Sequence, residues 1–100
     1  MQYHVLQLKD ITKVSYAFME YDYAKDHNFD LQDYEVVYEG ETNSISQDTS
    51  ILEELFCDFN CGVHPDFKGH SMSVSDIVQL TDDKGSRFYY CDPLGWTRLS

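Results

Sequence analysis

The sequence predicts an α+β domain with a four- to five-stranded, mostly antiparallel sheet and one or two helices packed on one face. Several short segments alternate apolar and polar residues with a period of two, as strands do, and turn residues separate them. Residues 51–59 instead place apolar residues at helical intervals. A chain of 100 residues is long enough for one core, so we expect one domain, 1–100.

Four segments are expected to be strands: 2–9, 34–41, 87–92 and, as a short last strand, 96–99. In 34–41 one face should be acidic and exposed to solvent. The centre of the sheet should be 65–80, where Ser71, Ser73 and Ser75 alternate with Met72 and Val74 before an apolar run. A turn at 82–85, with Gly85 at positive φ, should lead into strand 87–92.

Two helices are expected. Residues 11–23 hold apolar side chains at helical spacing with no Gly or Pro, which predicts a short helix, although their many tyrosines favour strand. The second helix should begin with Ser50 as N-cap and Glu53 completing a capping box, and end near Gly62. Its apolar stripe, which should pack on the sheet, is Ile51, Leu52, Leu55, Phe56 and Phe59.

The charge is localised. The chain carries a net charge of −11, and the segment from Glu20 to Asp58 contains twelve acids but one base, Lys25. The remaining residues are balanced, with six acids and six bases. Direct binding of nucleic acid is disfavoured, because phosphate contacts need clustered Lys and Arg. A protein partner with a basic surface or groove is favoured.

Tyrosines lie between these acids, and two interpretations stay open. The segment is either a solvated acidic face around half-buried rings, or a protein-binding surface with Tyr as anchors and carboxylates that mimic the phosphates of a duplex. The second interpretation defines the candidate partner-binding residues: Glu20, Tyr21, Asp22, Tyr23, Asp26, Asp30, Asp33, Glu35, Glu39 and Glu41.

Residues 70–76 contain the side-chain types of a nucleophilic site, namely His70, Ser71, Ser73, Ser75 and Asp76. A catalytic triad needs a strained, exposed nucleophile such as that of the Gly-x-Ser-x-Gly elbow, and none of these serines lies between glycines. We therefore interpret the motif as structural, with its hydroxyls and His70 bonded to neighbouring backbone. No catalytic residue is assigned, and the protein is not expected to be an enzyme.

Cys57, Cys61 and His64 have the spacing C-x3-C-x2-H, with His70 as a fourth candidate zinc ligand. This is not the usual short spacing of a zinc knuckle, and Cys is often buried for packing alone. We favour buried, reduced thiols and expect no metal, cofactor or small-molecule substrate. No apolar run is long enough to span a membrane, and the N-terminal residues lack the layout of a signal peptide, which predicts a cytoplasmic protein without a membrane partner.

Two segments, HPDFKGHSMSVSDIV (64–78) and FYYCDPLGW (88–96), resemble the YodL-like domain family of Gram-positive bacteria. The similarity extends to YEVVYEG (34–40) and ILEELFCDFN (51–60), so it covers most of the chain. The resemblance implies a bacterial accessory protein of the kind carried on conjugative elements and phages. It supplies no catalytic residues, and it implies interference with the actin-like cell-shape machinery as an alternative role.

Together these observations lead to three function classes. The first, which we favour, is a small acidic non-enzymatic inhibitor that binds a nucleic-acid-handling protein, such as a CRISPR effector or restriction enzyme, as a DNA mimic. The second is a regulatory module that binds a host protein, such as the cell-shape machinery, through an apolar patch. The third is an enzyme or metal protein that depends on His70, Cys57 or Cys61.

Overall fold

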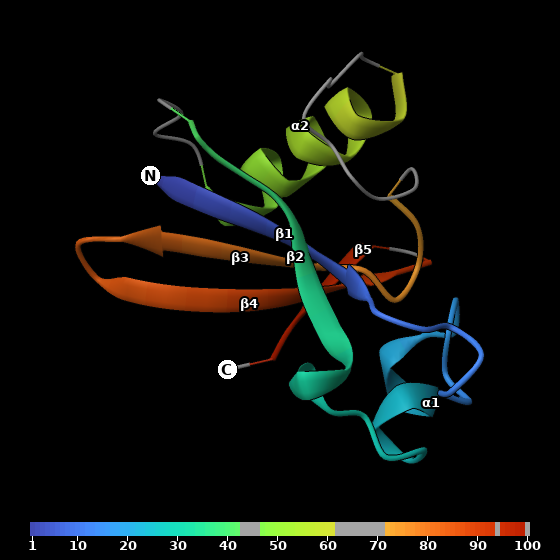
Figure 1. Ribbon diagram of the computed structural model, residues 1–100. Helices are drawn as coiled ribbons and strands as arrows, with labels where there is room; N and C mark the ends of the chain where they lie inside the picture. The colour runs from blue at the N-terminus through green and yellow to red at the C-terminus, as the bar shows by residue number, and fades with distance from the viewer. Residues whose placement is uncertain (43–46, 62–71, 94, 100) are drawn as a thin grey trace.

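The structure is a computed structural model that describes residues 1–42, 47–61, 72–93 and 95–99, with only the backbone of 58–61 (Figure 1). Its strands form a five-stranded antiparallel sheet in the order β2-β1-β3-β4-β5. The α+β prediction is confirmed. In chain order the elements are β1 (Gln2–Leu8), α1 (Tyr21–Lys25), the 3-10 helix η1 (Leu31–Asp33), β2 (Tyr34–Glu41), α2 (Asp48–Cys61), β3 (Ile77–Asp82), β4 (Gly85–Asp92) and β5 (Gly95–Arg98).

The sheet is apolar on both faces, because successive residues of a strand point to opposite sides. On one face, Val5 and Val78 pack in a core with α2, while their neighbours Leu6 and Ile77 belong to a second core on the other face. Figure 1 shows α2 and α1 on opposite sides of the sheet. The one long helix thus packs on one face, as expected, and the short α1 belongs to the opposite core.

α2 covers its face of the sheet with the predicted apolar stripe, in which Ile51, Leu52 and Leu55 are buried. The helix begins at Asp48, however, two residues before the expected N-cap. The backbone N–H groups of Ser50 and Ile51 both donate to the carbonyl of Gln47. Ser50 is therefore already inside the first turn, and the predicted capping box was wrong. The side chain of Phe59 and the expected stop at Gly62 lie outside what the structure describes.

The prediction of a helix over residues 11–23 was wrong. Residues 11–20 form turns, and only Tyr21–Lys25 is helical. Local side-chain bonds replace helical ones at the start, where the Asp10 carboxylate accepts from both the N–H and the hydroxyl of Thr12. Further along, Phe18 has a φ of 64°, which a right-handed helix cannot contain. The apolar spacing of this segment reflects packing on the sheet rather than a helix.

The centre of the sheet is correctly located, but its start was wrong. β3, the middle strand, begins at Ile77, and residues 72–76 before it are not extended as a strand but contain a turn at Val74 and Ser75. Ser75 has a φ of 83°, far from the extended backbone that a strand requires. The period-two pattern of the serines therefore does not continue into β3. Residues 65–71 lie outside the described residues.

β2 has the predicted bounds, but its side chains do not alternate regularly between the two faces. Val5 pairs with Tyr38 and Leu6 with Val36, which leaves Val37 as the extra residue of a β-bulge. The bulge exchanges the faces of the strand, so that Val37 is buried and Val36 is exposed. Glu35, Glu39 and Glu41 are exposed, but the bulge puts Glu35 on the opposite face from Glu39 and Glu41, so they do not form the single acidic face that was expected.

The C-terminal hairpin follows the prediction closely. β3 and β4 are joined by a two-residue turn, and Gly85 has a φ of 117°, which favours glycine. β5 covers 95–98, one residue away from the expected range at each end. Among the described helices, none has the length and apolar character needed to cross a bilayer.

Candidate functional site

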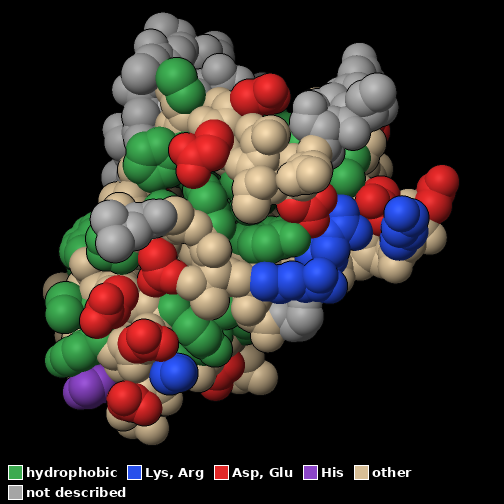
Figure 2. Space-filling model, turned by 180° about the vertical axis from the view of Figure 1, so that it is seen from behind, with side chains coloured by type: hydrophobic (Ala, Val, Ile, Leu, Met, Phe, Trp, Pro, Cys, Tyr) green, Lys and Arg blue, Asp and Glu red, His purple; other side chains and the backbone are tan. Residues whose placement is uncertain are grey.

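The predicted acidic residues lie on two separate parts of the fold. The first group, the α1 acidic group, is defined as Glu20, Asp22 and Asp26, which are all exposed at or beside α1. Asp22 forms an ion pair with Lys25 at 3.3 Å. Such an exposed pair contributes little to stability. Because Lys25 is one positive charge beside three carboxylates, the group keeps a net negative charge. Figure 2 shows acidic side chains lying among hydrophobic ones on the surface over α1, at the lower left.

Asp30 and Asp33, around η1, have local structural roles. Asp30 Oδ1 accepts from the backbone N–H of Gln32 at 2.9 Å, although Asp30 remains exposed. Asp33 is half-buried, and its Oδ2 accepts the hydroxyl of Tyr16 at 3.3 Å. Burial, together with the nearby Asp33 charge, raises the pKa of Tyr16 to about 12. Asp33 therefore has a structural role, because its carboxylate accepts a hydrogen bond from Tyr16 and is only partly accessible to solvent.

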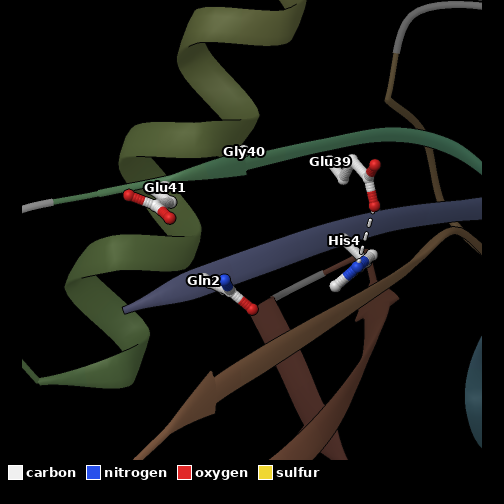
Figure 3. Close-up of a pocket in the computed structure, with 5 residues that line it drawn as sticks. All are labelled: Gln2, His4, Glu39, Gly40 and Glu41. Carbon is white, nitrogen blue, oxygen red and sulfur yellow. Dashed lines mark ion pairs between the residues drawn. The ribbon is translucent and has the colours of Figure 1, made fainter.

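The second group, the β2 acidic group, is defined as Glu35, Glu39 and Glu41. β2 is an edge strand of the sheet, and all three carboxylates are exposed. The bulge at Val37 places Glu39 and Glu41 on one face of the strand and Glu35 on the other. Glu39 Oε2 lies 3.2 Å from Nε2 of His4 on the neighbouring strand β1, as Figure 3 shows. Together with Gln2, Gly40 and Glu41 these two residues line a shallow surface hollow of about 270 Å³. The arrangement presents carboxylates to solvent at the edge of the sheet.

Tyr21 and Tyr23, the proposed aromatic anchors, are only half-exposed. The Tyr21 ring lies within 5.5 Å of Phe29 and 5.2 Å of Tyr90, measured between ring centroids. The Tyr23 ring stacks on His27 with centroids 3.8 Å apart. Tyr21 and Tyr23 thus pack against the second core while part of each side chain stays exposed, and their role as anchors stays a prediction.

The described part of the serine motif is a buried junction between the two faces of the sheet. The Ser75 hydroxyl accepts the backbone N–H of Phe18 at 3.0 Å, and the Ser75 carbonyl accepts the hydroxyl of Tyr34 at 2.6 Å. Asp76 is also buried, and its Oδ2 accepts from Gln7 Nε2 at 3.0 Å and from the N–H of Ser73 at 2.9 Å. These contacts connect four distant segments of the chain.

This junction holds backbone in place, and its hydroxyls face the interior. Ser75 is 1% exposed, so a substrate cannot reach its oxygen without rearrangement of the fold. The buried Ser73 hydroxyl has no hydrogen-bond partner among the described residues, unlike the expectation that each serine of the motif bonds to backbone. His70 and Ser71, the other members of the predicted motif, lie outside the described part of the chain.

The cysteines differ in their surroundings. Cys57 is exposed on α2, so the expectation that it is buried was wrong: it points away from the stripe formed by Leu52 and Leu55. Cys91 is buried, and burial, with the nearby carboxylates adding to it, raises the pKa of its thiol to about 12. Such a thiol is a poor nucleophile at neutral pH.

A metal site can be tested only in part. Among the described residues no group of three His, Cys, Asp or Glu side chains has an arrangement that could hold a metal ion. The Cys61 side chain, His64 and His70, which complete the candidate zinc set with Cys57, lie outside the described residues. The zinc alternative therefore stays a prediction.

Sequence reasoning missed two features. Phe18 and Met19, expected within a helix, are instead exposed side by side in a turn, and no Gly, Pro or capping signal marks that turn. Arg87 forms ion pairs with Asp48 on α2 and with Asp82 on β3, at 2.5 and 3.1 Å. This assigns Asp48, one of the twelve acids, to holding α2 against the sheet. The pair of Arg87 and Asp48 could not be predicted, because the two residues are 39 positions apart and no local pattern connects them.

Comparison with known proteins identifies one family. The model of the YodL-like domain matches residues 2–100, which is nearly the whole chain. A comparison with curated proteins finds no match, and neither does a comparison with solved structures.

Proposed function

The chain belongs to the YodL-like domain family, and from this premise and its surface charge we propose that it is a small non-enzymatic inhibitor that binds a basic surface of a nucleic-acid-handling protein. The partner would be a protein such as a CRISPR effector or a restriction enzyme, in which a basic channel receives nucleic acid. The exposed carboxylates would occupy that channel in place of phosphates.

The observation that carries this proposal is the exposure of the acids. Seven of the eight predicted partner-binding carboxylates are exposed, and only Asp33 is half-buried. Within the described residues two of the seven, Asp22 and Glu39, have ion-pair partners, and one of those partners is a histidine. Most of the local charge is therefore uncompensated, and it would attract a basic partner and favour fast association.

The α1 acidic group and the β2 acidic group lie on different elements, so the exposed carboxylates are distributed over the surface rather than gathered at one point. A mimic of a duplex needs charges distributed over an extended surface, since a duplex carries one charge per about 1.7 Å of its axis. Attraction between exposed charges falls off over about 10 Å at 0.1 M salt. Binding through these groups should therefore weaken steeply as salt is raised.

A second candidate is a regulatory module that binds a host protein, such as the actin-like cell-shape machinery, through apolar contacts. The exposed side chains of Phe18 and Met19 favour it, since adjacent exposed apolar residues are a feature of protein-binding surfaces. Under this candidate, binding would depend on apolar side chains and resist salt.

The test compares three variants with the same change in net charge. E20Q/D22N/D26N neutralises the α1 acidic group, E35Q/E39Q/E41Q neutralises the β2 acidic group, and E53Q/E54Q/D83N neutralises exposed acids elsewhere as the matched control. Each protein, and the wild type, is used to retain partners from a lysate of a Gram-positive bacterium at low and raised salt. Retained proteins are identified by mass spectrometry, and any nuclease is then assayed for DNA cleavage with each variant added.

We expect the wild type and the control variant to retain and inhibit a nucleic-acid-handling protein at low salt, and one or both site variants to lose it. The proposal fails if all four proteins retain the same partner with the same salt dependence, because the charge would then serve solubility alone. Retention of a filament protein that resists salt would support the regulatory candidate instead.

A further inference from the structure

Two apolar side chains are exposed next to each other in the turn before α1. Phe18 is 49% exposed and Met19 is 40% exposed. The other large exposed apolar residues described, Ile11, Leu31 and Val36, occur singly along the chain. Single exposed apolar residues are normal on a protein surface, whereas an adjacent aromatic and methionine pair is typical of interface cores. We call Phe18 and Met19, with the backbone that carries them, the 18–19 turn.

Buried groups hold the backbone of the 18–19 turn in place from beneath. The N–H of Phe18 donates to the buried Ser75 hydroxyl at 3.0 Å, and the Met19 carbonyl accepts the hydroxyl of Tyr90, also buried, at 2.6 Å. The Met19 N–H in turn donates to the Tyr16 carbonyl at 3.0 Å. The turn is thus tied to two distant residues, Ser75 and Tyr90, and closed locally by Tyr16, so its two side chains are presented by a fixed backbone.

The conformation of Phe18 is itself unusual. Its φ of 64° lies in the left-handed region, where a bulky side chain is disfavoured. Strained backbone of this kind persists where the surrounding structure determines it, and it is concentrated at binding sites. In this conformation Phe18 remains 49% exposed.

An acidic rim lies beside the 18–19 turn. Glu20 and Asp22 follow it in the sequence and, with Asp92, Pro93 and Thr97, line a surface hollow of about 260 Å³. Asp92 is held in place there, because its Oδ1 accepts the N–H of Tyr21 at 2.7 Å. In Figure 2 the surface over α1 shows hydrophobic and acidic side chains alternating. The exposed apolar pair is thus followed directly along the chain by carboxylates that line this hollow.

We infer that the 18–19 turn is the apolar anchor of a docking site for a protein segment that combines an apolar side chain with flanking Lys or Arg. The inference rests on the proposed function and assigns its contact to the α1 acidic group rather than to the β2 acidic group. Phe18 and Met19 would bury their side chains in the partner, and Glu20, Asp22 and Asp92 would pair with its basic residues. A preorganised anchor loses little entropy on binding, so it can contribute a large share of the affinity.

The test uses Phe18→Gly, which removes the anchor without breaking the turn. Glycine adopts a φ near 64° without strain and keeps the N–H that donates to Ser75, so the variant should unfold at the same temperature as the wild type or higher. The matched control is Val36→Ala, which shortens an exposed apolar side chain on β2, beside the other acidic group. E20Q/D22N reports on the acidic rim.

The probe is a phage-displayed library of random peptides, selected on the immobilised wild type. Enriched peptides are synthesised, and their dissociation constants are measured by fluorescence anisotropy for each folded variant at two salt concentrations. We expect peptides that carry both aromatic or aliphatic residues and Lys or Arg. Their affinity should fall at least about tenfold with Phe18→Gly, fall with E20Q/D22N in a salt-dependent way, and stay unchanged with Val36→Ala.

The outcomes separate this inference from the proposed function. If basic peptides are enriched that lose affinity with neutralised acids but bind Phe18→Gly as well as the wild type, the acidic function stands and the anchor is overturned. If Val36→Ala weakens binding and Phe18→Gly does not, the site lies on β2. Enrichment of peptides without basic residues, or no enrichment at all, also overturns the inference.

Discussion

On one face of the sheet a single amphipathic helix, α2, covers an aliphatic layer, whereas on the other face an irregular segment, residues 10–33, covers an aromatic one. The α2 face is filled mainly by aliphatic side chains such as Leu52 and Leu80, together with two tyrosines, Tyr3 and Tyr89. The opposite face is filled by tyrosines, among them Tyr16, Tyr34 and Tyr90. Each of those three hydroxyls has a hydrogen-bond partner.

The difference shows two ways of covering a sheet. Aliphatic packing needs only a helix with an apolar stripe, because dispersion and burial have no direction. An aromatic layer of tyrosines must also satisfy buried hydroxyls. Tyr90 donates to the Met19 carbonyl of the covering segment, whereas Tyr34 donates to the Ser75 carbonyl and Tyr16 to the Asp33 carboxylate. The bond from Tyr90 to Met19, together with that from the Phe18 N–H to the Ser75 hydroxyl, holds the turn that exposes Phe18. The surface we propose to be functional belongs to this second face.

The largest expected effect comes from breaking the aliphatic layer. Leu52 is completely buried between α2 and the sheet, and Leu52→Ala should lower the free energy of unfolding by about 2–4 kcal/mol, through lost burial and the cavity left behind. Urea denaturation followed by circular dichroism measures this. Ile11→Ala, at an exposed position, serves as the control and should change stability by less than about 0.5 kcal/mol. If both variants lowered the free energy of unfolding equally, the packing of α2 on the sheet would not be a main source of stability.

An intermediate effect is expected from the hydrogen bonds of the aromatic layer. Tyr34→Phe keeps the ring but leaves the buried Ser75 carbonyl without its donor, which should cost about 1–2 kcal/mol. Because Ser75 also holds Phe18, amide exchange should accelerate in residues 11–20 more than in α2. Hydrogen exchange read by mass spectrometry distinguishes the regions, and Tyr23→Phe, at a half-exposed ring, should leave both unchanged. Uniform acceleration over the whole chain would argue against a separate role for this layer.

The smallest effect is expected from the ion pair between Asp48 and Arg87, which joins α2 to β4. Hydrogen bonds from Arg87, helped by one from Tyr89, hold the pKa of Asp48 below its usual range, despite opposing burial. A lowered folded-state pKa means that Asp48 contributes stability above its unfolded pKa of about 3.9, and that this contribution is lost as pH falls through the folded value.

Asp48→Asn should therefore lower the melting temperature at pH 7 by a few degrees, corresponding to about 1 kcal/mol in a domain of this size. The same variant should lose less stability than the wild type between about pH 5 and pH 2. Thermal melts across that range measure both effects. Parallel acid dependence in the two proteins would show that Asp48 and Arg87 do not couple α2 to β4.

Much of the regular structure follows from local pattern. β1 and β2 could be predicted nearly to the residue, since each is a short run with β-favouring Tyr and Val between clear turn signals. The α2 stripe could be predicted too, as could the turn that Gly85 permits. The bulge at Val37 could not, because it depends on how β2 pairs with β1.

The candidate site could be predicted less completely. The acids were found because charge is a property of the sequence, but their division between α1 and β2 depends on the fold. Asp48 is drawn into a pair with Arg87, 39 residues away, and the Tyr21 ring packs into the core. Exposure of Phe18 and Met19 could not be expected from apolar spacing, which usually marks a buried face.

The sequence by itself determined the α+β class, the strands, the long helix and the concentration of negative charge between Glu20 and Asp58. Only the tertiary structure decided the form of residues 11–20 and 72–76. The bonds that shape those segments join Phe18 to Ser75, 57 residues apart, and Met19 to Tyr90, 71 residues apart. Local periodicity contains no information about partners at such separations, because these bonds exist only once the sheet has brought the segments together.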